Sequence, residues 1–192
     1  MTAARTEAVA VGASAGALEA LSVVLPRLPA GYPLPVLVVV HLPPDRDSLM
    51  VGLLGDSCRL PVREAQDKEP IEPGTIYFAP PDYHLLVEPD RRLSLSGEEP
   101  VLFSRPSIDV LFETAAETYG AGLAGVVLTG ANGDGARGLR AIRQAGGTAL
   151  VQRPETAAAA AMPLAALDAC PDAVALTLEE IAEYLRGMVP PR

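Results

Sequence analysis

The chain has 192 residues, of which 49% are hydrophobic, and this length suits one domain with one substantial core. Its 24 acidic and 15 basic side chains give a formal net charge of -9, which repels nucleic acid and anionic lipid surfaces. Cys58 and Cys170 are isolated and suit neither a disulfide framework nor a CxxC metal site. No stretch approaches the roughly 20 apolar residues that span a bilayer. We therefore expect a cytoplasmic protein without nucleic-acid binding or membrane insertion.

The beginning of the chain predicts a βαβ unit. Continuous apolar runs at residues 8–12 and 35–41 are typical of strands that are buried on both faces of a parallel sheet. Between them, residues 17–28 carry apolar side chains at helical spacing, and Pro29 and Gly31 then end the helix.

A different pattern follows in the middle of the chain. Short predicted strands at residues 74–79, 84–87 and 93–95 are separated by turns rich in proline and aspartate. This pattern predicts an antiparallel hairpin or meander that is inserted into the main fold and does not form a domain of its own.

The second half of the chain returns to alternating strands and helices. A helix at residues 107–119 has Ser107 as a possible cap and Asp109 in its first turn. Further elements are predicted as a strand at 125–128, a helix at 135–145, a strand at 148–152, a helix start or tight loop at 157–161, and a helix at 178–188. The sequence thus predicts an α/β fold with a single doubly wound, mostly parallel, Rossmann-like sheet. The domain should cover residues 8–189, with short tails at 1–7 and 190–192.

Ser14 is the first candidate for chemistry. Residues 12–16 read Gly-Ala-Ser-Ala-Gly, a G-x-S-x-G pattern in which small neighbours allow a serine to stand exposed on a sharp strand-to-helix turn. N–H groups in the first turn of the following helix could stabilise an oxyanion there. A glycine-rich turn of this kind can instead hold a phosphate or simply reverse the chain.

A serine nucleophile needs a base, and the chain has two histidines. His41 follows the second predicted strand, so it should lie beside the turn that carries Ser14. His84 begins a predicted hairpin strand, where a half-exposed structural residue is expected. We therefore favour His41 as the base.

Asp134 is the candidate for the acid that orients the histidine. It lies between a predicted parallel strand and a predicted helix, at the same edge of the sheet as Ser14 and His41. The alternative is that Asp134 only caps the helix that begins at Gly135.

Six segments of the chain together resemble a known family. In chain order they are VGASAGALEAL, VVVHLP, IYFAPPDYHLLV, RPSIDVLF, VVLTGANGDGARGL and Met162-Pro163. Their types and order resemble the catalytic domain of CheB-type protein-glutamate methylesterases, over almost the whole chain.

The resemblance implies a Ser-His-Asp triad of Ser14, His41 and Asp134, with backbone N–H groups at or near Ala15 and Ala131 as oxyanion donors. It implies hydrolysis of glutamate 5-methyl esters, and deamidation of certain glutamines, on a methylated chemoreceptor or a related signalling protein. This chemistry needs no metal and no organic cofactor. Members of the family usually carry an amino-terminal receiver domain, for which the seven residues before the first predicted strand leave no room. We therefore expect constitutive activity, control by a separate regulatory protein, or a role outside flagellar chemotaxis.

The chain departs from the family pattern at several positions near these residues. Ala15 and Val40 replace the usual threonine and glutamine, Ala131 replaces a common methionine, and Asn132-Gly133 reverses the usual Gly-Asn order. Backbone donors should survive such changes, whereas the substrate pocket should be reshaped.

Other classes of protein compete with this interpretation. A dinucleotide-binding oxidoreductase would have an acid where His41 stands, and an ordinary α/β-hydrolase would need a histidine later than His84. A catalytically silent binding domain of the same fold would carry the same residues, so the sequence leaves it open.

Overall fold

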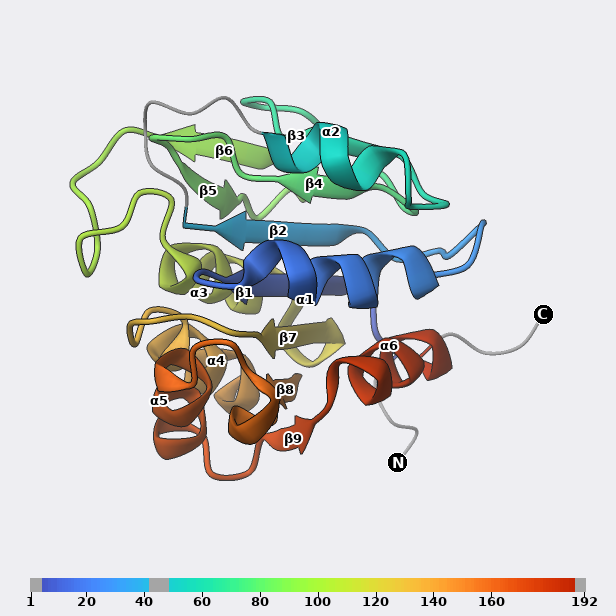
Figure 1. The fold of residues 1–192 in the computed structure, drawn as a ribbon. Coiled ribbons are helices and arrows are strands. Elements are labelled where there is room, and N and C mark those ends of the chain that lie inside the picture. The colour runs from blue at the N-terminus through green and yellow to red at the C-terminus, as the bar shows by residue number, and fades with distance from the viewer. Residues whose placement is uncertain (1–4, 42–48, 189–192) are drawn as a thin grey trace.

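A parallel sheet forms the centre of the computed structural model, which describes residues 5–41 and 49–188 (Figure 1). Its strand order is β3-β4-β2-β1-β7-β8-β9. The strands are β1 (Ala8–Ala13), β2 (Val36–Val40), β3 (Val62–Glu64), β4 (Ile76–Phe78), β7 (Leu123–Val127), β8 (Thr148–Gln152) and β9 (Val174–Leu176). The helices are α1 (Ala17–Val24), α2 (Leu49–Gly55), α3 (Ile108–Tyr119), α4 (Ala136–Gln144), α5 (Ala161–Ala169) and α6 (Leu178–Gly187). The predicted tail 190–192 and the domain boundary at 189 lie outside the described residues, as do residues 1–4.

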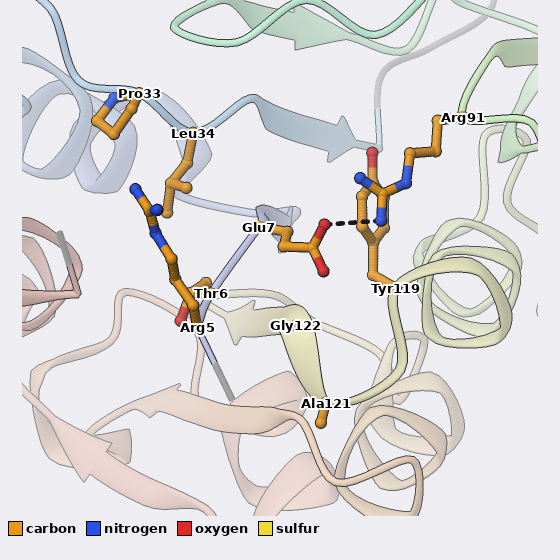
Figure 2. Close-up of a pocket in the computed structure, with 9 residues that line it drawn as sticks. All are labelled: Arg5, Thr6, Glu7, Pro33, Leu34, Arg91, Tyr119, Ala121 and Gly122. Carbon is orange, nitrogen blue, oxygen red and sulfur yellow. Dashed lines mark ion pairs between the residues drawn. The ribbon is translucent and has the colours of Figure 1, made fainter. Parts of the chain in front are cut away.

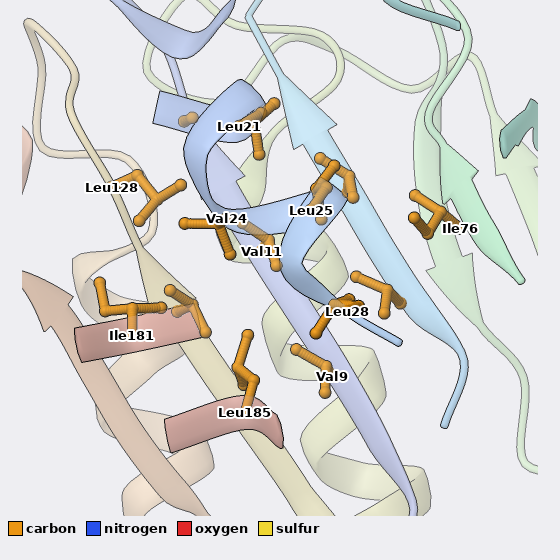
Figure 3. Packing of buried hydrophobic residues seen from close by; sticks show 14 of the residues in the cluster. Val9, Val11, Leu21, Val24, Leu25, Leu28, Ile76, Leu128, Ile181 and Leu185 are labelled. Carbon is orange, nitrogen blue, oxygen red and sulfur yellow. The ribbon is translucent and has the colours of Figure 1, made fainter. Parts of the chain in front are cut away.

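Helices cover both faces of the sheet, as the continuous apolar runs predict. On one face, α1 and α6 pack over side chains such as Val9 and Val11 of β1 (Figure 3), and α2 extends the same cluster beside β3. On the other face, α3 packs over β1, and α4 and α5 pack over β7 and β8, in a cluster that includes Ala8 and Ala10 of β1. Every residue of β1 and β2 is buried, which is typical of central strands in a doubly wound sheet. The predicted fold class is confirmed.

The predicted antiparallel hairpin is confirmed, and the alternative of a meander that includes residues 74–79 is wrong. The antiparallel pair consists of β5 (His84–Val87) and β6 (Leu93–Ser96), which form a separate two-stranded sheet. The strand before it, β4, instead runs parallel between β2 and β3 in the main sheet. All three residues of β4 are buried, and so short a strand gives no alternation by which its sheet could be recognised.

The order of the strands reverses around β1, which has β2 on one side and β7 on the other. Such a reversal opens a crevice at the carboxyl ends of the strands, where doubly wound proteins bind their ligands. Ser14 follows β1, His41 follows β2, and the loop that contains Asp134 follows β7. The topology therefore brings all three candidate residues to one edge of the sheet.

Close packing of α3 onto β1 depends on Gly12. A Cβ atom at this position would overlap the side chain of Ile108, the first residue of α3. The amino terminus of α3 can therefore approach the sheet only because β1 has no side chain at this point.

Gly12→Ala should lower the free energy of unfolding by about 1 to 3 kcal/mol, because overpacking forces α3 away from the sheet. Urea denaturation measures this change. Combining Gly12→Ala with Ile108→Ala should cost less than the sum of the two single variants, since the second change makes room for the first. Additive costs would contradict the proposed steric conflict.

Candidate active site

The turn that carries Ser14 is held by hydrogen bonds from the neighbouring strand end. The Ser14 N–H donates to the Thr129 carbonyl at 2.9 Å, and the Thr129 hydroxyl donates to the Ala15 carbonyl at 2.8 Å. Gly16 then begins α1 with a φ of 81°, a left-handed conformation that favours glycine. A Cβ atom there would also lie 2.7 Å from that of Ala158. The G-x-S-x-G pattern thus forms the predicted sharp strand-to-helix turn.

Ser14, His41 and Asp134 lie in one chain of hydrogen-bonding contacts. His41 Nδ1 is 3.2 Å from Ser14 Oγ, and His41 Nε2 is 2.7 Å from Asp134 Oδ2. The strand register sets the first contact, because the His41 N–H donates to the Ala13 carbonyl of the neighbouring strand end. The structure therefore brings together the three side chains that the sequence singled out.

The contacts determine which ring nitrogen of His41 carries the proton. An ionised carboxylate can only accept, so Nε2 donates its hydrogen to Asp134 and Nδ1 is left to accept from the Ser14 hydroxyl. The ring is turned the opposite way from the serine-protease arrangement, in which Nε2 faces the serine. Both ring nitrogens can exchange protons, so Nδ1 in this orientation can take a proton from the Ser14 hydroxyl as Nε2 does in the proteases.

The amino terminus of α3 holds the Asp134 carboxylate. The Ser107 hydroxyl and the Asp109 N–H each donate to Oδ1 at 2.9 Å, and the Ile108 N–H donates to Oδ2 at 2.7 Å. The side chain of Asp134 is fully buried. N–H groups in the first turn of a helix are free of partners inside that helix and favour negative charge. Asp134 is thus fixed by donors from a distant helix.

Asp109 makes the reciprocal contact with α4. Its Oδ1 accepts from the N–H groups of Gly135 at 3.1 Å and Gly138 at 2.7 Å. The alternative in which Asp134 caps the helix beginning at Gly135 is therefore wrong, because Asp109 takes those donors. Ser107 occupies the cap position of α3, but its hydroxyl bonds Asp134 and not its own helix.

His84 binds the backbone at Ser107, directly before α3. It is only 2% exposed, and the expectation of a half-exposed residue is wrong. Its Nδ1 accepts from the Ser107 N–H at 3.1 Å, so Nε2 carries the hydrogen and donates to the Glu99 carbonyl at 3.0 Å. The sequence offered no sign of this role, since the segments that contain His84 and Ser107 meet only in the folded chain.

The two neighbouring carboxyl groups have opposite pKa shifts. Burial alone would raise the pKa of Asp134, but the hydrogen bonds from His41 and from the N–H groups of Asp109 and Ile108 outweigh it and lower the pKa. Burial raises the pKa of Asp109, and the negative charge of Asp134 adds to this rise despite the hydrogen bond from Gly138. Asp134 is therefore the group that the surroundings keep ionised.

Two backbone N–H groups near Ser14 remain available as donors. Those of Ala15 and Ala131 donate to no acceptor among the described residues. The loop around Ala131 is shaped by Asn132, whose side-chain oxygen accepts from the Asp134 N–H at 3.1 Å. This local turn depends on the Asn132-Gly133 order by which the chain departs from the family pattern.

A separate hollow of about 570 Å³ lies at the opposite edge of the sheet (Figure 2). It contains Glu7, which precedes β1, and Gly122, which precedes β7, so it lies at the amino ends of the strands. An ion pair of 2.7 Å joins Glu7 to Arg91, and Arg91 also stacks on Tyr119. None of the candidate catalytic residues lines this hollow.

Residues 5–41 and 49–188 contain neither a cluster of metal-binding side chains nor a membrane-spanning helix. No group of three or more histidine, cysteine and acidic side chains in these ranges could hold a metal ion. No helix there is both long enough and apolar enough to cross a bilayer.

Comparison with known proteins places the chain in a family. The CheB methylesterase family model matches residues 9–185, and the chain belongs to this family. A Leptospira interrogans protein is 48% identical over 177 residues, which make up 92% of each chain. Protein-glutamate methylesterase/protein-glutamine glutaminase 2 of Anaeromyxobacter dehalogenans is 40% identical over 97% of this chain and 54% of its own length. The crystal structure of the Thermotoga maritima CheB methylesterase catalytic domain superposes with a TM-score of 0.91 at 30% identity, covering 97% of this chain and all of that one.

Asp109→Asn should relieve a charge that the fold disfavours while keeping an oxygen for the N–H groups of α4. Because the folded-state pKa of Asp109 is raised, its ionisation weakens folding as the pH rises from about 4 through the raised value. The unfolding free energy of Asp109→Asn relative to the parent should therefore increase between pH about 4 and about 7.

Urea denaturation at the two pH values measures this difference. Glu117→Gln, which removes an exposed carboxyl group from the same helix, is the control and should follow the parent. If the unfolding free energy of the parent increased relative to that of Asp109→Asn as the pH rises, the prediction would be wrong.

Proposed function

We propose that this protein is a serine esterase that hydrolyses glutamate 5-methyl esters on a methylated chemoreceptor or a related signalling protein. The observation that carries the proposal is the Ser14–His41–Asp134 hydrogen-bonded chain at the carboxyl edge of a CheB methylesterase fold. We further propose that residues 8–189 act as one catalytic unit. A separate regulatory protein is the proposed means of control.

In the proposed first step, Ser14 Oγ attacks the ester carbonyl while His41 Nδ1 removes the hydroxyl proton. The N–H groups of Ala15 and Ala131 would donate to the oxyanion of the tetrahedral intermediate. His41 then returns the proton to the leaving oxygen, so methanol departs and Ser14 carries an acyl group. The bond between Ser14 Oγ and the acyl carbon forms in the attack, and the bond between that carbon and the methoxy oxygen breaks when the intermediate collapses.

In the second step, water replaces methanol in the same relay. His41 removes a proton from the water as it attacks the acyl group, and then returns this proton to Ser14 Oγ. The products are the free glutamate side chain and the restored hydroxyl. Asp134 stabilises the positive imidazole ring that exists in both halves of the reaction, and its four hydrogen-bond donors hold it in place.

Deamidation of glutamine would use the same acyl intermediate. The amide carbonyl is attacked as the ester is, and ammonia leaves after His41 protonates the nitrogen. The name of the Anaeromyxobacter dehalogenans relative combines the two activities. A glutamine residue in the same protein substrate is thus the second proposed target.

Ser14→Ala and His41→Ala should each lower the rate of methyl-ester hydrolysis roughly 10⁴-fold or more, and the double variant should be little worse, because the groups act as a unit. Methanol release from methylated receptor fragments measures the rate. A fluorophosphonate probe should label the parent protein but not Ser14→Ala. Absence of both labelling and turnover in the parent would favour a catalytically silent binding domain.

Asp134→Asn should lower the rate by roughly 10⁴-fold, because the amide presents hydrogens to His41 or to the α3 donors where a carboxylate would accept. Unfolding should also cost about 1 to 3 kcal/mol less, since buried donors lose their acceptor.

Ser107→Ala is the matched control for Asp134→Asn. It removes one donor to Oδ1 and leaves the contact between Oδ2 and His41 in place. Its stability should fall by about 1 kcal/mol, with less than about a tenfold loss of rate. Comparable rate losses in the two variants, measured by methanol release, would contradict a specific role for the Asp134 carboxylate.

A further inference from the structure

A two-residue turn between β6 and α3 has an unusual sequence. The N–H groups of Val101 and Ser104 each donate to the other's carbonyl, at 3.0 and 2.9 Å, and close the turn. The central residues Leu102 and Phe103 have φ angles of 48° and 64°. A hairpin turn with positive φ at both central positions strongly favours sequences such as Asn-Gly. Bulky residues in this conformation are strained outliers, and such strain tends to occur at functional sites.

The side chains of this Leu-Phe turn (residues 101–104) gain little from packing within the described chain. Leu102 is 52% exposed and Phe103 is 102% exposed. The turn therefore combines an unfavourable backbone conformation with apolar side chains in water. A contact outside the chain would account for both features.

The Leu-Phe turn is tied to the candidate active site. Arg105 donates to the Asp82 carboxylate at 2.6 and 3.0 Å, and to the carbonyls of Gly97 and Glu98 at 2.9 Å. Ser107, two residues further on, bonds Asp134. In Figure 1 the segment between β6 and α3, drawn in yellow-green, extends past the carboxyl ends of the strands.

A hollow of about 420 Å³ lies next to the turn. Its lining is mostly apolar and small, with three charged residues: Val101, Leu102, Gly133, Ala136, Ala169, Asp109, Arg137 and Arg140. Gly133 precedes Asp134 directly and belongs to the same loop as Ala131, so the hollow begins beside the proposed catalytic edge.

The two arginines of the hollow differ in their partners. Arg137 pairs with Glu113 at 2.5 Å and approaches Asp109 at 3.8 Å. The side chain of Arg140 is exposed and makes no hydrogen bond or ion pair with any described residue. In a chain with a net charge of -9, this free positive charge marks a place where an acidic group is locally favoured.

We propose that the Leu-Phe turn and this hollow form the docking surface for the protein substrate. The surface would bind a segment of that substrate that places apolar side chains against Leu102 and Phe103 and an acidic side chain toward Arg140. The inference rests on the proposed function, because a segment with its ester at Ser14 must cross the neighbouring surface. It adds the chemistry by which the enzyme selects a protein ester over a small one.

The test replaces the strained pair by the sequence that the turn favours, in the double variant Leu102→Asn with Phe103→Gly. The probe is a peptide with one glutamate 5-methyl ester, neighbouring leucines and flanking glutamates. We expect kcat/KM for this peptide to fall about tenfold, while hydrolysis of p-nitrophenyl acetate changes less than about twofold. Unfolding in urea should require at least as much denaturant as in the parent, because Asn-Gly suits the turn.

Arg140→Gln tests the charge. It should remove the parent's preference for the peptide over a copy in which the flanking glutamates are glutamines. Tyr184→Gln is the control for the double variant, because it also removes an exposed aromatic side chain, but from α6, away from the Leu-Phe turn. This control should leave hydrolysis of both the peptide and the acetate unchanged.

Binding of the same peptide, measured by fluorescence anisotropy in the Ser14→Ala background, separates this inference from the proposed function. Peptide binding that depends on the turn, without any turnover by the parent, supports the docking surface and refutes the esterase. Turnover that is indifferent to the turn and to Arg140 refutes the docking surface alone. Equal loss of peptide and acetate hydrolysis, or a dimer that the double variant abolishes in sedimentation, would also overturn it.

Discussion

The candidate site depends on an exchange of carboxylates between two helices. Asp134, from the loop before α4, accepts the free N–H groups of α3, and Asp109, from α3, accepts those of α4. Each amino terminus therefore receives a carboxylate from the segment that contains or precedes the other helix, and a helix amino terminus favours such a negative charge. Neither acid can be removed without leaving buried donors unsatisfied, so the packing of α3 against α4 fixes the position of Asp134.

This exchange combines stability with the proposed chemistry. The strand register already places Ser14 beside His41, and the buried Asp134 then determines which ring nitrogen of His41 faces the serine. The surroundings keep Asp134 ionised but disfavour the charge of Asp109. The fold thus accepts an unfavourable charge at Asp109 while it keeps the neighbouring Asp134 ionised, a compromise often found at functional sites.

The surface around the site differs in chemistry from its interior. Inside, backbone N–H groups and buried carboxylates hold the candidate catalytic groups. Because backbone groups make many of these contacts, they do not depend on the side chains at Ala15 and Ala131. Outside, the Leu-Phe turn keeps apolar side chains in water on a strained backbone, at the mouth of a hollow with one free arginine. The interior is thus suited to the proposed reaction, and the exterior to the proposed docking of a protein substrate.

The sequence by itself determined the strands and turns that a local residue pattern predicts, and the edge of the sheet at which the candidate residues lie. Apolar runs predicted β1, β2 and β8, and the glycine turn and the strand ends placed Ser14, His41 and Asp134 at one edge, since parallel strands in βαβ units end together. Tertiary structure alone decided the sheet to which β4 belongs and the donors from α3 that bind Asp134. An aspartate before a helix looks like a cap in sequence, but the donors that bind Asp134 from the start of α3 lie 25 to 27 residues away, from Ser107 to Asp109. Hydrogen bonds between distant segments follow from helix packing, which no local pattern records.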